Sequence, residues 1–221
     1  MLIDTGEDED GEEILEWLSK RGIATVDHMI ITHFDKDHVG GADTVLAGIA
    51  VSNLYEPDYF KEGKQYEQYV EAKEQADIAA QVVTEQILLS MGDVQILIDP
   101  TKEAPDTAQD NDWSLAISVT HGQNRMLFAG DAEDLRMAEL MTREDIAHTL
   151  LKVPHHGKFH DLSEAFLRAV DPQYAIITCS DKNPESQELM EVLNRLQVQT
   201  YLTRNGDITI TSDGNRLTIA Q

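Results

Sequence analysis

A mostly apolar run, residues 26–32, leads directly into a dense group of potential metal ligands. The run is rich in isoleucine, as expected of a strand that is covered on both faces. Four imidazole and carboxylate side chains follow within six residues, and then two glycines: His33, Asp35, Asp37, His38, Gly40 and Gly41. A mixed oxygen and nitrogen set suits Zn, Mn or Fe, and the glycines fit a loop whose backbone must pass closely. A metal site is therefore favoured over a solvated turn.

Two later apolar stretches end in the same way. One leads to Asp131, and the other leads to the adjacent pair His155 and His156. Each is a weak signal alone, because a Gly-Asp turn after a strand and a pair of surface histidines are both common. Taken together, they predict that Asp131 bridges two cations and that the segments at His33 and His155 meet in one cleft.

The rest of the chain alternates helices, strands and hairpins. Helices are expected at residues 12–20, 162–170 and 185–196, near Ala42, and as a surface helix or lid within 61–81. Strands are expected at residues 51–55, 149–153, 174–178 and 199–202, with hairpins over 87–98, 115–128 and 207–219. This pattern predicts two mixed sheets packed face to face with helices outside, in one domain spanning residues 1–221. Residues 99–112 are expected to be a loop within that domain.

The composition limits the plausible partners. The chain has 17 basic and 41 acidic side chains and a formal net charge of −24, which argues against a nucleic-acid coat protein and against an anionic membrane surface. It contains no apolar run of about 18 residues, as a membrane span requires, and no signal-peptide pattern at its start. A single cysteine, Cys179, permits no internal disulfide. We therefore expect a cytoplasmic protein with no membrane partner.

Five separated segments, in this order, resemble the motifs of metallo-β-lactamase-fold hydrolases, and more closely those of the ComEC/Rec2-like branch. They are Leu2-Ile3-Asp4-Thr5-Gly6, the histidine and aspartate motif of residues 33–38, Asn111-Asp112-Trp113-Ser114-Leu115, Ala129-Gly130-Asp131 and residues 151–157. The resemblance covers nearly the whole chain. It implies an α/β fold, a four-layer αββα sandwich of two mixed sheets with helices on the outer faces. The first N-terminal strands of that fold are expected to be missing, because Met1 falls inside the pattern.

The resemblance also implies two divalent metal ions, Zn or Mn. His33 and Asp35 would hold one metal, Asp37 and His38 the second, and Asp131 both. One histidine of the adjacent pair would complete the second site; His156 is preferred and His155 remains open, since neighbours on an extended segment face opposite ways. Asp37 and Asp131 would be catalytic, and Lys158 and Asn111 would contact the substrate.

Three departures from the family pattern bear on this reading. The histidine that many members place before the central strand is absent, so Asp110, Asn111 or Asp112 would have to supply oxygen ligands to a weaker first site. Lys158 stands where serine is usual after the histidine pair, and residues 182–184 replace another usual segment. The remaining histidines lie outside the motifs and are expected to be structural or solvent-exposed: His28, His121, His148 and His160.

The leading functional prediction is a hydrolase that uses a metal-activated hydroxide, most readily a phosphodiesterase or nuclease. Its substrate would be a small phosphodiester or nucleic acid, although the net charge opposes long polyanions. The alternatives are a hydrolase of an ester, thioester or lactam, and a non-catalytic metal-binding regulatory module. An aspartic protease is disfavoured, because the Asp4-Thr5-Gly6 triplet has no second copy. An exposed sheet edge predicts a homo-oligomer or a strand-donating partner.

Overall fold

The computed structural model describes residues 1–102 and 110–221, and these form two compact units, Met1–Thr84 and Glu85–Gln221. The predicted loop at residues 99–112 lies partly outside the described residues, and its last part begins a short 3-10 helix, Asp110–Trp113. A single domain over residues 1–221 stays a prediction.

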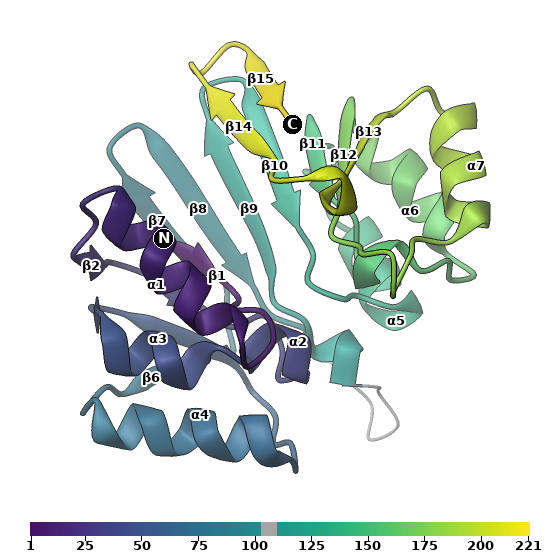
Figure 1. Cartoon of the computed structure of the whole chain (residues 1–221). Coiled ribbons are helices and arrows are strands. Elements are labelled where there is room, and N and C mark those ends of the chain that lie inside the picture. Colours follow the sequence, from purple (N-terminus) through teal and green to yellow (C-terminus); the bar gives the residue numbers. More distant parts are fainter. Residues whose placement is uncertain (103–109) are drawn as a thin grey trace. The chain divides into compact units, whose positions relative to one another are not determined.

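The first unit contains a four-stranded sheet in the order β1–β3–β5–β6, in which every pair is parallel (Figure 1). Its strands are β1 (Leu2–Ile3), β3 (Met29–Ile30), β5 (Leu54–Pro57) and β6 (Ala80–Val83), and a separate parallel pair joins β2 (Thr25–Val26) to β4 (Ala50–Val51). The helices are α1 (Asp10–Lys20), α2 (Lys36–Val39), α3 (Ala42–Gly48) and α4 (Lys64–Gln75).

Two expectations for this unit need correction. The sheet is parallel rather than mixed, because its strands are joined by helical crossovers and not by hairpins. The run at residues 26–32 is not one strand, since β2 pairs with β4 while β3 pairs with β1 and β5. The predicted burial is nevertheless confirmed, because Met29, Ile30 and Ile31 are fully buried.

The second unit contains a seven-stranded mixed sheet in the order β13–β12–β11–β10–β9–β8–β7 (Figure 1). Strands β7 to β10 pair antiparallel and strands β10 to β13 pair parallel, with bounds Ile87–Met91, Val94–Asp99, Ala116–His121, Asn124–Phe128, Leu150–Lys152, Tyr174–Ile177 and Gln199–Leu202. A final hairpin joins β14 (Thr209–Ser212) to β15 (Leu217–Ala220). The hairpins predicted from the turn residues are confirmed.

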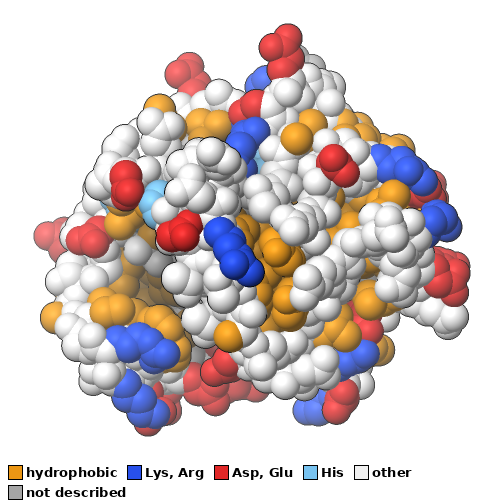
Figure 2. Space-filling view, turned by 90° about the horizontal axis from the view of Figure 1, so that it is seen from above, with side chains coloured by type: hydrophobic (Ala, Val, Ile, Leu, Met, Phe, Trp, Pro, Cys, Tyr) orange, Lys and Arg blue, Asp and Glu red, His pale blue; other side chains and the backbone are white. Residues whose placement is uncertain are grey.

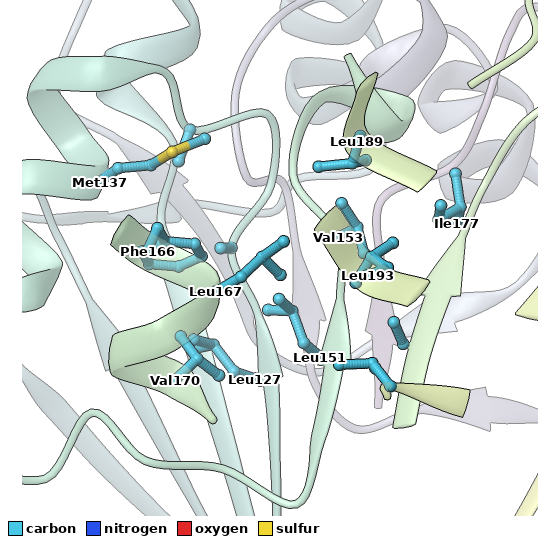
Figure 3. Packing of buried hydrophobic residues seen from close by; sticks show 14 of the residues in the cluster. Leu127, Met137, Leu151, Val153, Phe166, Leu167, Val170, Ile177, Leu189 and Leu193 are labelled. Atoms are coloured by element: carbon cyan, nitrogen blue, oxygen red, sulfur yellow. The ribbon is translucent and has the colours of Figure 1, made fainter. Parts of the chain in front are cut away.

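Three helices of this unit, α5 (Asp134–Met141), α6 (Ser163–Val170) and α7 (Gln187–Arg195), contribute to one core with the parallel strands. Figure 3 shows Phe166 and Leu167 of α6 and Leu189 and Leu193 of α7 gathered near Leu151 of β11. This packing fixes the C-terminal ends of β10 and β11, from which the candidate residues Asp131 and His156 follow.

Acidic side chains are spread over the face of the molecule in Figure 2, with Lys and Arg side chains between them rather than in one basic strip. Within residues 1–102 and 110–221, no helix combines the length and the apolar character that crossing a membrane requires.

Candidate functional site

The candidate residues form two clusters, one in each unit. We call residues His33, Asp35, Asp37 and His38 the N-terminal cluster. His33 follows β3, Asp35 is the N-cap of α2, and Asp37 and His38 lie on α2. Both imidazoles are buried, and their ring centroids lie 4.0 Å apart. The helix α2 brings together side chains that the sequence placed only in a loop.

The close backbone approach predicted from the two glycines is confirmed. A Cβ atom on Gly41 would lie 2.5 Å from the carbonyl oxygen of Thr5, so no larger residue fits there without a shift. This contact holds the Asp4-Thr5-Gly6 turn against the start of α3. The Thr5 backbone N–H also donates to the His38 carbonyl oxygen at 2.8 Å.

Asp4 orients the two histidines of the N-terminal cluster. Its carboxylate accepts a hydrogen bond from His38 Nδ1 at 2.7 Å, and it also accepts from the Thr32 backbone N–H and hydroxyl at 2.7 and 2.8 Å. Burial alone would raise the pKa of Asp4, but the neighbouring His38 and His33 and the Thr32 N–H hold that pKa below its usual value. The carboxylate is therefore ionised at neutral pH.

These bonds fix the tautomers of both rings. A carboxylate only accepts, so His38 carries a proton on Nδ1, and in the neutral ring Nε2 is then the nitrogen with the free electron pair. The Thr32 hydroxyl donates its proton to Asp4 and accepts from His33 Nδ1 at 3.0 Å, so the neutral His33 ring has the same tautomer. An imidazole whose Nδ1 proton is held by a carboxylate or hydroxyl is a typical metal ligand through Nε2. The donor set thus fits a divalent metal.

Replacing Asp4 with asparagine is expected to weaken Zn or Mn binding about tenfold, because second-shell changes of this kind cost 10 to 100-fold in affinity. The backbone is not disturbed, since Asp4 has a φ of 57° and asparagine tolerates this conformation equally well. Chelator competition with the purified chain measures the change. Asp27→Asn, at an exposed position of the same unit, is the control; equal affinities in both variants would remove Asp4 from the site.

Lys61 is an unpredicted neighbour of the N-terminal cluster. Its ammonium forms an ion pair with the half-buried carboxylate of Asp35. The two residues are far apart in sequence, so no local pattern indicates this contact. Asp37 is also half-buried, on the first turn of α2.

The C-terminal cluster consists of Asn111, Asp131, His155, His156 and Lys158. His156 donates its Nδ1 proton to the Thr178 carbonyl oxygen at 2.8 Å, and its Nε2 lies 3.2 Å from Asp131 Oδ2. The other carboxylate oxygen of Asp131 lies 3.4 Å from the Lys152 ammonium. Lys152 therefore contacts a candidate ligand.

The turn that carries the histidine pair has a left-handed backbone at three successive residues. The φ angles are 48° at His155, 52° at His156 and 79° at Gly157. A Cβ atom on Gly157 would lie 2.8 Å from Ile177 Cγ2, which explains the glycine. Two successive non-glycine residues in this region are costly and are typical of functional sites. Because of this turn, the imidazoles of His155 and His156 contact different neighbours.

His155 contacts a group of its own. Its Nε2 accepts from the Lys158 ammonium at 2.7 Å, and its Nδ1 lies 3.0 Å from His160 Nε2 and 3.1 Å from Glu133 Oε1. The ligand atoms of Glu133, His155 and His160 lie within 4.8 Å of one another, so this group can hold a metal ion. Burial lowers the pKa of His155, and the Lys158 charge lowers it further.

Asn111 lies beside this group, since its amide nitrogen donates to Glu133 Oε1 at 2.8 Å. Sequence reasoning missed Glu133 and gave His160 no functional weight. Glu133 lies two residues after Asp131, and His160 lies four residues after His156. This closeness to the motifs was the sequence signal that could have indicated them.

Residues 1–180 match the family model described as the Metallo-beta-lactamase superfamily. The chain belongs to the metallo-beta-lactamase superfamily. This membership supports a metal-dependent hydrolase in general, and the clusters here can bind metal ions. The resemblance read from the five motifs is confirmed.

Among curated relatives, the chain is similar to ComE operon protein 3 of Bacillus subtilis, with 31% identity over 205 residues, which are 90% of this chain and 26% of that protein. It is also 30% identical to Recombination protein 2 of Haemophilus influenzae over 213 residues, 95% of this chain and 25% of that protein. The chain thus spans about a quarter of the length of these relatives.

Solved structures show the same metallo-beta-lactamase fold. YhfI from Bacillus subtilis matches with a TM-score of 0.58 at 10% identity, covering 98% of this chain and 85% of that one. Igni18, a metallo hydrolase from Ignicoccus hospitalis, matches with a TM-score of 0.56 at 12% identity, covering 88% of this chain and 79% of that one. These likenesses confirm the predicted fold class.

Proposed function

We propose that this metallo-beta-lactamase superfamily chain is a metal-dependent phosphodiesterase. The observation that carries the proposal is that lysine ammonium groups contact candidate ligands in both clusters. Lys61 pairs with Asp35, and Lys152 lies 3.4 Å from Asp131. Only 17 of 221 residues are basic, so these placements are notable in an acidic chain. Ammonium groups beside a metal site favour an anionic substrate, as a phosphodiester is and a neutral ester or lactam is not.

The names of the relatives support the same substrate class. Recombination protein 2 is named for recombination, a process of DNA, whose backbone is a chain of phosphodiesters. The net charge of −24 favours short substrates over long ones, because the electrostatic repulsion between this acidic chain and a polyanionic substrate grows with the length of the substrate. We therefore propose a nucleotide-sized or oligonucleotide diester as the substrate.

The proposed metal roles follow the order of the motifs in the sequence. His33 and Asp35 would hold one divalent metal, Asp37 and His38 the second, and Asp131 both. When bound, such a metal pair supplies Lewis acidity and lowers the pKa of water. His156 is the preferred ligand of the adjacent pair, because its Nδ1 proton is held by a backbone carbonyl while both ring nitrogens of His155 have other neighbours. Lys158 and Asn111 are proposed to contact the substrate.

The test is hydrolysis of bis(p-nitrophenyl) phosphate by chelator-stripped protein resupplied with Mn or Zn. Turnover is expected to require the metal. Asp37→Ala is expected to lower kcat/KM about 100-fold. This is the upper end of the range for changes at the hydrogen-bond partners of ligands, and it is chosen because Asp37→Ala removes a proposed ligand itself. Asp27→Ala, an exposed aspartate of the same unit, is the matched control.

Two outcomes would contradict the proposal. Turnover of p-nitrophenyl acetate with an intact diester would indicate an ester hydrolase. Bound metal with neither substrate cleaved would indicate a binding module.

A further inference from the structure

Glu133, His155 and His160 form a group in the second unit that contains none of the preferred ligands of the proposed metal pair. His155 Nδ1 lies 3.0 Å from His160 Nε2 and 3.1 Å from Glu133 Oε1. Ligand atoms bonded to one ion at about 2.0–2.1 Å lie about 2.8–3.4 Å apart, whether the bond angles are right angles or tetrahedral. The two separations are therefore those of ligands on a single metal ion.

The backbone holds the segments that carry these ligands against each other. Glu133 is the N-cap of α5, and the carboxylate of the next residue, Asp134, accepts a hydrogen bond from the Leu162 backbone N–H at 2.8 Å. The His160 backbone N–H donates to Ser163 Oγ at 2.8 Å, at the start of α6. The positions of Glu133 and His160 are thus set by bonds that do not involve their own side chains.

Hydrogen bonding alone leaves this group short of protons. A lysine ammonium only donates, so His155 Nε2 accepts from Lys158 at 2.7 Å and the neutral His155 ring carries its proton on Nδ1. That single proton faces two acceptors, His160 Nε2 and Glu133 Oε1. A divalent cation in place of the proton is bound by all three atoms.

The donor set selects the class of metal. Two imidazole nitrogens and one carboxylate oxygen suit Zn or Fe, whereas Mg and Ca take mainly oxygen ligands. His155 is 8% exposed, and Glu133 and His160 are half-buried, so an ion from solvent can reach the group. Three protein ligands leave room for water in the coordination shell, as in catalytic zinc sites and unlike closed structural ones.

We propose that Glu133, His155 and His160 form an additional site for a divalent transition metal, separate from the proposed metal pair. Metal binding to His155 Nδ1 places the one proton of the neutral ring on Nε2, and Nε2 then no longer accepts from the Lys158 ammonium. Occupancy of the site therefore releases Lys158 from His155. The site does not depend on phosphodiesterase activity.

The test uses zinc as the probe and counts the ions bound by the chelator-stripped full chain, by competition titration and elemental analysis. His160→Gln and Glu133→Gln are each expected to lose the same single zinc ion. The affinity for that ion is expected to fall more than about 100-fold, since a ligand itself is removed or loses its charge. His121→Gln is the matched control. His121 Nε2 also lies 3.0 Å from a carboxylate, that of Asp93, but His121 belongs to no three-ligand group within the described residues.

Lys158→Gln tests which atom of His155 binds the metal. A glutamine oxygen accepts from the Nε2 proton and carries no charge, so zinc affinity is expected to rise about tenfold, in the range for a changed hydrogen-bond partner of a ligand. A zinc affinity that does not rise in this variant would overturn binding through Nδ1. Unchanged zinc counts and affinities in both His160→Gln and Glu133→Gln would overturn the site, and amide NMR spectra check that each variant keeps its fold.

Discussion

Replacing Arg136 with methionine is expected to lower the free energy of unfolding by about 3 kcal/mol, the lower end of the range for breaking a buried ion pair. Arg136 on α5 is 1% exposed. Its guanidinium donates to the Ser114 carbonyl oxygen at 3.1 Å and to the Asp99 carbonyl oxygen at 2.6 Å, and it lies 3.1 Å from Asp99 Oδ2. Methionine has similar length but donates nothing, so the buried Asp99 carboxylate loses one of the two cations that contact it.

The loss is at the lower end because Arg143 also contacts Asp99 Oδ2, at 3.0 Å. Urea unfolding measures the change, with Arg168→Met as the control. The Arg168 guanidinium pairs with Glu164 at 2.7 Å on the exposed face of α6, where an ion pair contributes about 0.3–0.5 kcal/mol. Adding Asp99→Asn to Arg136→Met is expected to recover part of the loss. Similar midpoints for the two arginine variants would show that the buried network contributes little.

This network also reaches the candidate site. The Arg136 guanidinium donates to the Ser114 carbonyl oxygen at 3.1 Å, and Ser114 Oγ accepts from the Asp131 N–H at 3.1 Å. Asp112 Oδ1 accepts from the Arg136 backbone N–H at 3.0 Å, a bond that methionine keeps. Arg136→Met is therefore expected to displace the turn that carries Asp131. The Asn-Asp-Trp-Ser-Leu segment of the family pattern is thus a structural brace for Asp131 in the second unit, in addition to any contact that Asn111 makes.

The elements that sequence reasoning predicted are those with a local signal. The hairpins are marked by glycine turns between β-rich runs, and α6 and α7 show apolar residues at helical spacing. Helix α5 was missed because Arg136 occupies a core position, which hides the apolar stripe. The splitting of residues 25–32 into β2 and β3 follows from which strands they pair with, and pairing partners are not visible in one short run.

The candidate site also contains features with a local sequence signal, which were predicted, and features without one, which were not. The motif residues themselves were predicted from density and spacing, but their orientation was not. Asp4 was recognised only as part of a turn, and its bond to His38 joins residues 34 positions apart. Likewise, the contact of Lys61 with Asp35 spans 26 positions. Such contacts are set by the sheet register that places β1 beside β3, and register is a property of the folded chain.

The free energy of unfolding of the second unit is expected to fall by about 3 kcal/mol between pH 7 and pH 4, because one of its histidines is buried in the neutral form. His148 is 4% exposed. Its Nδ1 proton goes to the Ile146 carbonyl oxygen at 2.7 Å, so its Nε2 accepts from the Ser118 hydroxyl, also at 2.7 Å. Burial lowers the pKa of His148 from 6.5 to about 4. The folded state therefore holds the ring neutral where the unfolded chain binds a proton.

The direction follows from linkage. Because the folded-state pKa lies below the unfolded value, the contribution of neutral His148 is fully present above about pH 6.5 and is lost as the pH falls toward 4. Below that pH the folded ring also binds a proton, and the loss levels off. His148→Gln removes the titrating group while an amide can still bond to Ser118. The stability difference between the unaltered chain and this variant is expected to shift by about 3 kcal/mol over the same pH range.

Ser118→Ala separates titration from the lost hydrogen bond. This variant keeps His148 buried, so its stability is expected to be lower at every pH while the fall between pH 6.5 and 4 persists, because burial is the main cause of the lowered pKa. Urea unfolding at several pH values measures both variants, and NMR titration of the His148 ring reports its protonation directly. A ring that titrates near pH 6.5, or a His148→Gln variant with the same acid sensitivity as the unaltered chain, would place the acid-sensitive group elsewhere. If the prediction holds, the acid sensitivity of the second unit originates largely in His148 in the sheet around β9, and His155, whose pKa burial also lowers, adds to it in the same direction.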